Sequence, residues 1–135
     1  MHQDIINIIT NHYPNVQAIY LFGTYGTDDE WQDSDIDIAV LLPHETAKKL
    51  ASLVMSDCRW ELERELHKNI DLINIRCVST VFQTEIISAN RKIDCRDTRA
   101  ADEFEMLTLS YYQQLNFERK EILEEIKTTG KVLNI

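Results

Sequence analysis

The sequence is poor in the residues that break or cross-link a chain. Its 135 residues include three glycines, two prolines and three cysteines. So few breakers predict long helices and strands joined by short connections. An odd number of cysteines without a C-x-x-C pair argues against a disulfide framework or a structural zinc site. We therefore expect reduced thiols, as in a cytoplasmic protein.

Long apolar runs and basic residues are also scarce. The longest apolar stretch, residues 36–42, is interrupted by Asp37 and is far shorter than the roughly 20 residues of a membrane span. The first ten residues lack the basic start and apolar run of a signal peptide. Fourteen Lys and Arg stand against 23 Asp and Glu, a formal net charge of −9. This charge disfavours nucleic-acid or anionic-lipid binding, but it permits a basic protein partner or a cation that brings in a phosphate.

Length and apolar periodicity predict a single domain over residues 1–135. The helical period predicts helices at 3–12, 45–68, 80–91 and 100–128. Runs of β-branched and aromatic residues predict strands at 16–22, 36–42 and 69–77, with a short edge strand at 92–95. This order predicts an α/β or α+β domain, in which helices pack on a small sheet and the last helix is long.

The last predicted helix carries an apolar stripe at helical spacing. The stripe consists of Phe104, Leu107, Tyr111, Leu115, Ile122 and Ile126. We expect it to pack in the core, as most such stripes do. The alternative is that one of its faces docks a partner protein, because exposed aromatic patches mark interfaces.

Acidic residues interrupt two of the apolar strands. Asp35 and Asp37 are two positions apart, so their side chains project from one face of the strand, with Cα atoms about 7 Å apart. Two like charges on an apolar strand are costly unless a cation lies between them, and Mg²⁺ prefers such oxygen ligands. Asp71 interrupts the strand predicted at 69–77. If that strand lies beside the first, Asp71 completes a cluster of three carboxylates.

The first predicted strand ends abruptly at Gly23-Thr24. Glycine permits a sharp turn that approaches a ligand closely, and the following N–H groups with the Thr24 hydroxyl can bind phosphate oxygens. Taken singly, a Gly-Thr pair is usually an ordinary turn, and an Asp-x-Asp pair usually lies on a solvated face. Together they provide donors for a polyphosphate and a clamp for a metal ion, which suits phosphoryl or nucleotidyl transfer.

These residues resemble a known signature. Gly23-Thr24, ten further residues and Asp35-Ile36-Asp37 are similar to the G-S-x10-D-x-D motif of the DNA polymerase β-type nucleotidyltransferase superfamily. The chain length and the TTGKVL ending resemble the minimal (MNT) branch, antitoxins paired with HEPN-domain toxins. The resemblance implies a small mixed sheet, Asp35, Asp37 and Asp71 as Mg²⁺ ligands and catalytic acids, with Asp71 as general base, and Gly23 and Thr24 as contacts for the ATP phosphates.

The resemblance also implies a function. In a type VII-like toxin–antitoxin pair, the MNT protein moves AMP from ATP to a tyrosine of the HEPN toxin and so silences its RNase. Two features depart from the family pattern: Thr24 replaces serine, and Thr27-Asp28 stands where many members carry Arg-Gly. Lys48, Lys49 and Arg76 are the candidates for the missing positive charge.

Two other functions remain open at this point. An acidic antitoxin could neutralise its toxin by occlusion, without catalysis. A nucleotidyltransferase could instead modify a small-molecule hydroxyl, such as that of an aminoglycoside, although the short chain leaves little room for a separate substrate domain. None of the three functions calls for direct contact with nucleic acid or a membrane.

Overall fold

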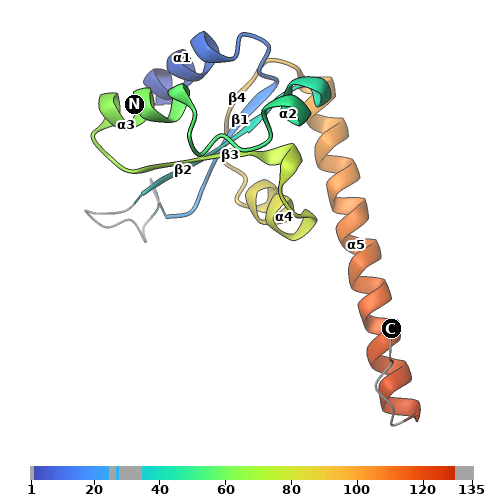
Figure 1. Cartoon of the computed structure of the whole chain (residues 1–135). Coiled ribbons are helices and arrows are strands. Elements are labelled where there is room, and N and C mark those ends of the chain that lie inside the picture. Colours follow the sequence, from blue (N-terminus) through green and yellow to red (C-terminus); the bar gives the residue numbers. More distant parts are fainter. Residues whose placement is uncertain (1, 25–26, 28–34, 130–135) are drawn as a thin grey trace.

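The computed structural model of the protein describes residues 2–24, 27 and 35–129 (Figure 1). A four-stranded sheet lies at the centre, with helices on both of its faces. The elements follow the order α1 (His2–His12), β1 (Ala18–Phe22), β2 (Ile36–Leu41), α2 (His44–Leu50), α3 (Asp57–Leu66), β3 (Ile70–Asn74), the 3₁₀-helix η1 (Ile75–Cys77), α4 (Thr80–Ser88), β4 (Lys92–Cys95) and α5 (Thr98–Thr129).

The sheet is mixed, with the strand order β3-β2-β1-β4. Strand β1 runs antiparallel to β2 and β4, whereas β2 and β3 are parallel. The predicted α/β class, the small mixed sheet and the edge strand at 92–95 are thereby confirmed. In this register Asp37 lies opposite Phe22 on one side and Asp71 on the other.

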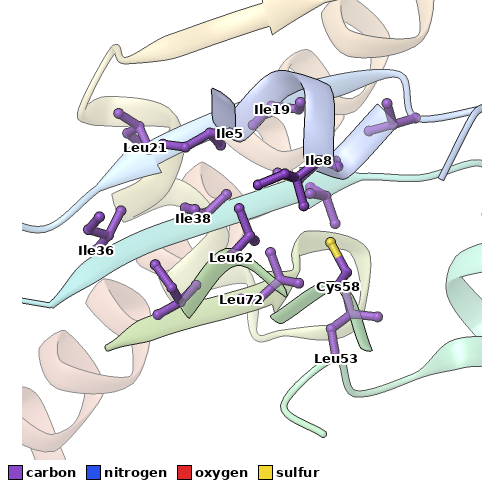
Figure 2. Close-up of a cluster of buried hydrophobic side chains, with 14 of the residues drawn as sticks. Ile5, Ile8, Ile19, Leu21, Ile36, Ile38, Leu53, Cys58, Leu62 and Leu72 are labelled. Atoms are coloured by element: carbon purple, nitrogen blue, oxygen red, sulfur yellow. The ribbon is translucent and has the colours of Figure 1, made fainter. Parts of the chain in front are cut away.

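Strand β2 supplies side chains to two apolar layers. Ile36, Ile38 and Val40 face α1 and α3 in the core that Figure 2 shows. Ala39 and Leu41 face the opposite layer, which α4 and α5 cover. Because side chains alternate along a strand, the odd-numbered acids that precede Ala39 lie on this second face.

The single long helix predicted at 45–68 is wrong, because the chain breaks between α2 and α3. Ala51 adopts a positive φ of 54°, and the Ser56 side chain caps the first turn of α3. Leu53 is buried in the core between them. The Asn74 amide nitrogen donates hydrogen bonds to the carbonyls of Ala47 and Ala51, 3.0 and 2.9 Å away. These bonds satisfy carbonyl groups where α2 ends.

The two last helices differ in how much of their apolar surface is covered. Helix α4 begins as predicted, with the Ser79 hydroxyl accepting a hydrogen bond from the Phe82 N–H, and Val81 in its first turn is exposed. Helix α5 extends well beyond the sheet (Figure 1). The expectation that its stripe packs in the core holds for Phe104 and is wrong for Leu107, Tyr111, Leu115 and Ile122, which are exposed. No helix in the described part of the chain is long and apolar enough to cross a membrane.

Candidate active site

Three carboxylates gather where β2 and β3 begin. Asp37 and Asp71 are register partners on parallel neighbouring strands, so their side chains leave the same face of the sheet about 5 Å apart at the backbone. Asp35 directly precedes β2, two positions before Asp37 and therefore on that face. We call Asp35, Asp37 and Asp71 the acid cluster.

The acids of this cluster repel one another. Asp37 is half-buried, and its pKa is raised from 3.8 to about 6. Burial is the largest cause, followed by the negative charges of Asp71 and then of Asp35. Each of these causes disfavours the charged carboxylate, and a bound cation would reverse the two electrostatic ones. The charged carboxylates of the cluster are therefore destabilised in the folded chain alone, and binding of a cation would stabilise them.

Gly23 brings the turn after β1 against the acid cluster. Its φ of 74° lies in the left-handed region, and a Cβ added there would fall on Asp37 Oδ2. Only glycine meets both conditions without strain. Thr24 follows, and its carbonyl accepts hydrogen bonds from the Thr27 N–H and hydroxyl, 3.0 and 2.5 Å away. The Gly-Thr turn thus lies directly beside the carboxylate pair.

A basic side chain that sequence reasoning missed lies at the same turn. The Arg91 guanidinium donates a hydrogen bond to the Gly23 carbonyl at 3.2 Å. Its backbone carbonyl accepts from the Leu21 N–H at 2.9 Å, which anchors the residue to β1. Arg91 is the last residue of the helix predicted at 80–91, and the one sequence signal for its role was its place just before the predicted edge strand at 92–95.

The cations expected from the sequence lie elsewhere. Lys48 and Lys49 belong to α2, and Arg76 belongs to η1. These elements follow the carboxyl ends of the parallel strands β2 and β3, whereas the acid cluster lies at their amino ends. Arg76 lines a cavity of about 380 Å³ at that far end. The cavity is therefore separate from the acid cluster.

The acid cluster offers oxygen ligands that suit a divalent cation. Among the described residues, no three Asp, Glu, His or Cys side chains are arranged to enclose a metal ion by themselves. Such a closed protein cage is not what Mg²⁺ sites on phosphate substrates use, because one or two carboxylates share the ion with phosphate oxygens and water. The carboxylates present therefore fit an ion that arrives with a phosphate ligand.

Comparison with known proteins gives concordant matches. The family described as "Polymerase beta, Nucleotidyltransferase" matches residues 3–99. The chain is 34% identical over 127 residues to the protein adenylyltransferase MntA of Shewanella oneidensis, covering 90% of this chain and 84% of that protein.

Solved toxin–antitoxin structures resemble the chain over almost its whole length. A complex with AMP-PNP is 29% identical with a TM-score of 0.68, covering 93% of this chain and 98% of that one. A complex of the tri-AMPylated HEPN toxin of Shewanella oneidensis with its MNT antitoxin is 32% identical with a TM-score of 0.62, covering 93% and 95%.

Proposed function

The chain belongs to the polymerase β nucleotidyltransferase family, and from this premise we propose that it is an antitoxin that moves AMP from ATP to a tyrosine of a HEPN ribonuclease toxin. The observation that carries the proposal is the pairing of Asp37 with Asp71, with Gly23 packed against Asp37. The similarity to a protein adenylyltransferase and to a complex with an AMPylated toxin supports the same reaction. The proposal places the protein in the cytoplasm, where ATP is available.

We assign the turn after β1 to the triphosphate of ATP. The backbone at Gly23 approaches closely because no side chain intervenes, and Thr24 adds a hydroxyl donor. Arg91 supplies the positive charge at this turn that the family's Arg-Gly pair supplies in other members. A guanidinium binds phosphate oxygens through two parallel N–H groups, which fixes the orientation of the phosphate as well as its position.

We assign the acid cluster to a divalent metal ion. Nucleotidyltransferases of this type use such an ion together with ATP, and we infer Mg²⁺ because the carboxylates at Asp35, Asp37 and Asp71 are hard oxygen ligands. When bound, the ion neutralises charge that develops on the phosphates during transfer. The carboxylates would hold the ion beside the Gly-Thr turn, which packs against Asp37.

The proposed reaction forms one bond and breaks one. The tyrosine oxygen attacks the α-phosphorus of ATP, the bond from that phosphorus to the bridging oxygen breaks, and pyrophosphate leaves with the electron pair. We assign acceptance of the tyrosine proton to Asp71, which lies exposed on the outer strand β3. The product is a tyrosine–AMP phosphodiester, whose bulk and negative charge would obstruct RNA binding by the toxin.

Intact-mass analysis of the toxin tests this proposal directly. A HEPN-domain toxin is co-expressed with this chain, and we expect the mass of the toxin to rise by whole adenylyl units. The Asp35→Asn/Asp37→Asn variant, at the same expression level, should give unmodified toxin while keeping its fold by circular dichroism. Full modification by that variant would contradict the assignment of the acids.

Occlusion is the second candidate, and the net charge of −9 favours it. An acidic surface accelerates association with a basic partner and can block it without chemistry. The same carboxylate variant separates the two functions. Under occlusion, cells that produce the toxin survive with the variant as well as with the wild-type protein, and the toxin mass does not change in either case.

A further inference from the structure

We propose that a groove between α4 and the distal part of α5 is the surface on which the toxin docks for modification, an inference that rests on the proposed function. The groove has a volume of about 390 Å³ and is lined by Val81 of α4 and by Tyr112, Leu115, Arg119 and Ile122 of α5, among others. We call it the α4–α5 groove. It belongs neither to the acid cluster nor to the cavity at Arg76.

The apolar face of α5 continues after the helix has left the sheet. Phe104 is 8% exposed and packs in the domain, whereas Leu115 and Ile122 are 45% and 39% exposed. The spacings from Phe104 to Leu115 and from Leu115 to Ile122 are 11 and 7 residues, about three and two helical turns, so the three share one face. Exposed apolar surface of this kind marks an interface with another molecule.

The composition of the groove fits a protein partner. Its floor is apolar, while Glu118 and Arg119 add charges of both signs along α5. An apolar centre with a polar rim is the usual anatomy of a protein–protein interface. The aromatic ring of Tyr112, which is half-buried, adds the type of residue that is enriched at such centres.

The position of α4 favours the toxin as occupant over a second copy of this chain. Helix α4 contacts both α5 and β1, and in Figure 1 it lies between α5 and the sheet. The Phe82 ring meets Phe22 edge-to-face with centroids 5.5 Å apart, and Phe22 is the register neighbour of Asp37. A molecule seated in the groove therefore contacts, at Val81, the helix whose next residue packs on the strand neighbour of Asp37.

Transfer to a protein tyrosine needs such a hold. Binding energy from contacts away from the reacting atoms positions the acceptor, so that a bimolecular step becomes effectively unimolecular. A second antitoxin in the groove would place no acceptor at the cluster and would compete with the substrate. The groove therefore serves the reaction only if the substrate protein occupies it.

Steady-state kinetics of toxin modification test the groove. The variant Leu115→Asp/Ile122→Asp alters two exposed side chains, and a HEPN-domain toxin that this chain modifies is the substrate. We expect the KM for toxin to rise about thirtyfold, as when central interface residues are removed, while kcat and the KM for ATP stay within about twofold. The matched control is Phe117→Asp, since Phe117 is 61% exposed and points away from the groove side of α5; its KM for toxin should stay within about twofold. An unchanged KM in the groove variant overturns the proposal.

Binding measurements separate failure of the docking surface from failure of the proposed function. The Asp35→Asn/Asp37→Asn protein should bind the toxin with wild-type Kd, and adding the groove changes should weaken that Kd about thirtyfold. If the wild-type chain transfers no AMP but the groove changes still weaken binding, the docking surface stands and the transferase does not. If light scattering shows a dimer of the chain that the groove changes split, with toxin binding unchanged, the occupant is a second copy and the proposal is wrong. Leu115→Ser/Ile122→Ser, checked by its melting temperature, repeats the test without new charges.

Discussion

The polar side chains at the two ends of the sheet differ in whether the chain itself supplies their partners. Where β2 and β3 finish, Asn74 donates to the carbonyls of Ala47 and Ala51, and Arg76 donates to the Leu42 carbonyl and to the Gln17 side chain. Where the same strands begin, the acid cluster brings like charges together. Burial first, and then the negative charges of Asp71 and Asp35, raise the pKa of Asp37. At the far end these donor groups find acceptors within the chain, although the buried Asn74 Oδ1 has no partner among the described residues. At the acid end, none of the ion pairs within the described part of the chain involves the acid cluster.

This difference in pairing distinguishes residues that stabilise the fold from residues that are suited to binding a ligand. A polar group paired within the chain recovers its lost hydration through the hydrogen bonds that it makes. Carboxylates that repel one another weaken the folded state, and such groups cluster at functional sites. We therefore expect substitutions at the acid end to remove activity and spare stability, and substitutions at the far end to do the reverse.

The largest expected effect is at the acid end, from Asp71→Asn. Loss of the carboxylate to which we assign acceptance of the tyrosine proton should lower kcat for AMP transfer about a thousandfold. The free energy of unfolding should not fall, because a repulsion with Asp37 is removed. Initial rates from the toxin mass and urea unfolding measure the two quantities. Asp102→Asn on the exposed surface of α5 is the control and should leave both unchanged. A destabilised Asp71→Asn protein with wild-type kcat would show that Asp71 supports the fold and not the reaction.

The next effect is at the far end, from Asn74→Ala. Its amide loses two hydrogen bonds to the carbonyls of Ala47 and Ala51, so the free energy of unfolding should fall by about 2 kcal/mol. The transfer rate per folded molecule, measured well below the melting temperature, should stay near that of the wild-type protein. Asn11→Ala, at an exposed position of α1, is the matched control for urea unfolding. A large loss of kcat in a stable Asn74→Ala protein would show that this end also serves the reaction.

Local patterns predicted the strands and the motif, but the tertiary structure placed them. Alternation around Asp37 and Asp71 was visible in the sequence, yet only the parallel pairing of β2 with β3 makes the two acids neighbours. The break between α2 and α3 was not predictable from periodicity, because apolar residues continue at helical spacing across it. It is stabilised by Asn74, which lies 23 residues beyond Ala51.

Long-range contacts also explain why Arg91 was missed and why the burial of the α5 stripe was predicted wrongly. Arg91 lies 68 residues from Gly23 in the chain and reaches it because β4 pairs with β1. The stripe on α5 has one period throughout, and a period does not tell whether the chain itself or a partner covers a helix face. Burial of Phe104 and exposure of Leu115 are decided by where the sheet ends.

A third prediction tests Arg91, the one basic side chain that we assign to the acid end. Arg91→Gln should raise the KM for ATP about tenfold, because a charge-assisted contact to the triphosphate is lost. Arg91→Lys keeps the charge and should recover part of the loss. Arg96→Gln is the control, since Arg96 follows β4 and pairs with Asp94 at 3.1 Å. Equal KM values for ATP in Arg91→Gln and Arg96→Gln would contradict the assignment of Arg91 to the triphosphate of ATP.

The smallest effect is the pH dependence of stability at the acid end. The folded pKa of Asp37 is about 6, against an ordinary value of 3.8, so between these values the folded state binds more protons than the unfolded state. Its contribution to the free energy of unfolding therefore falls as pH rises from about 4 to about 6 and is constant above that range. Solvent screening of a half-exposed carboxyl limits the fall to about 1 kcal/mol.

Urea unfolding of the wild-type protein and Asp37→Asn across this range isolates the contribution of Asp37, because other carboxylates titrate in both proteins. We expect the stability difference between the two to grow in favour of Asp37→Asn up to about pH 6. Mg²⁺ should reduce that difference at pH 7.5, since a cation favours the charged carboxylate, and should act more weakly at pH 5, where the carboxyl is protonated. A difference that does not change with pH would mean that the repulsion is already compensated within the chain, and the acid end would then resemble the far end.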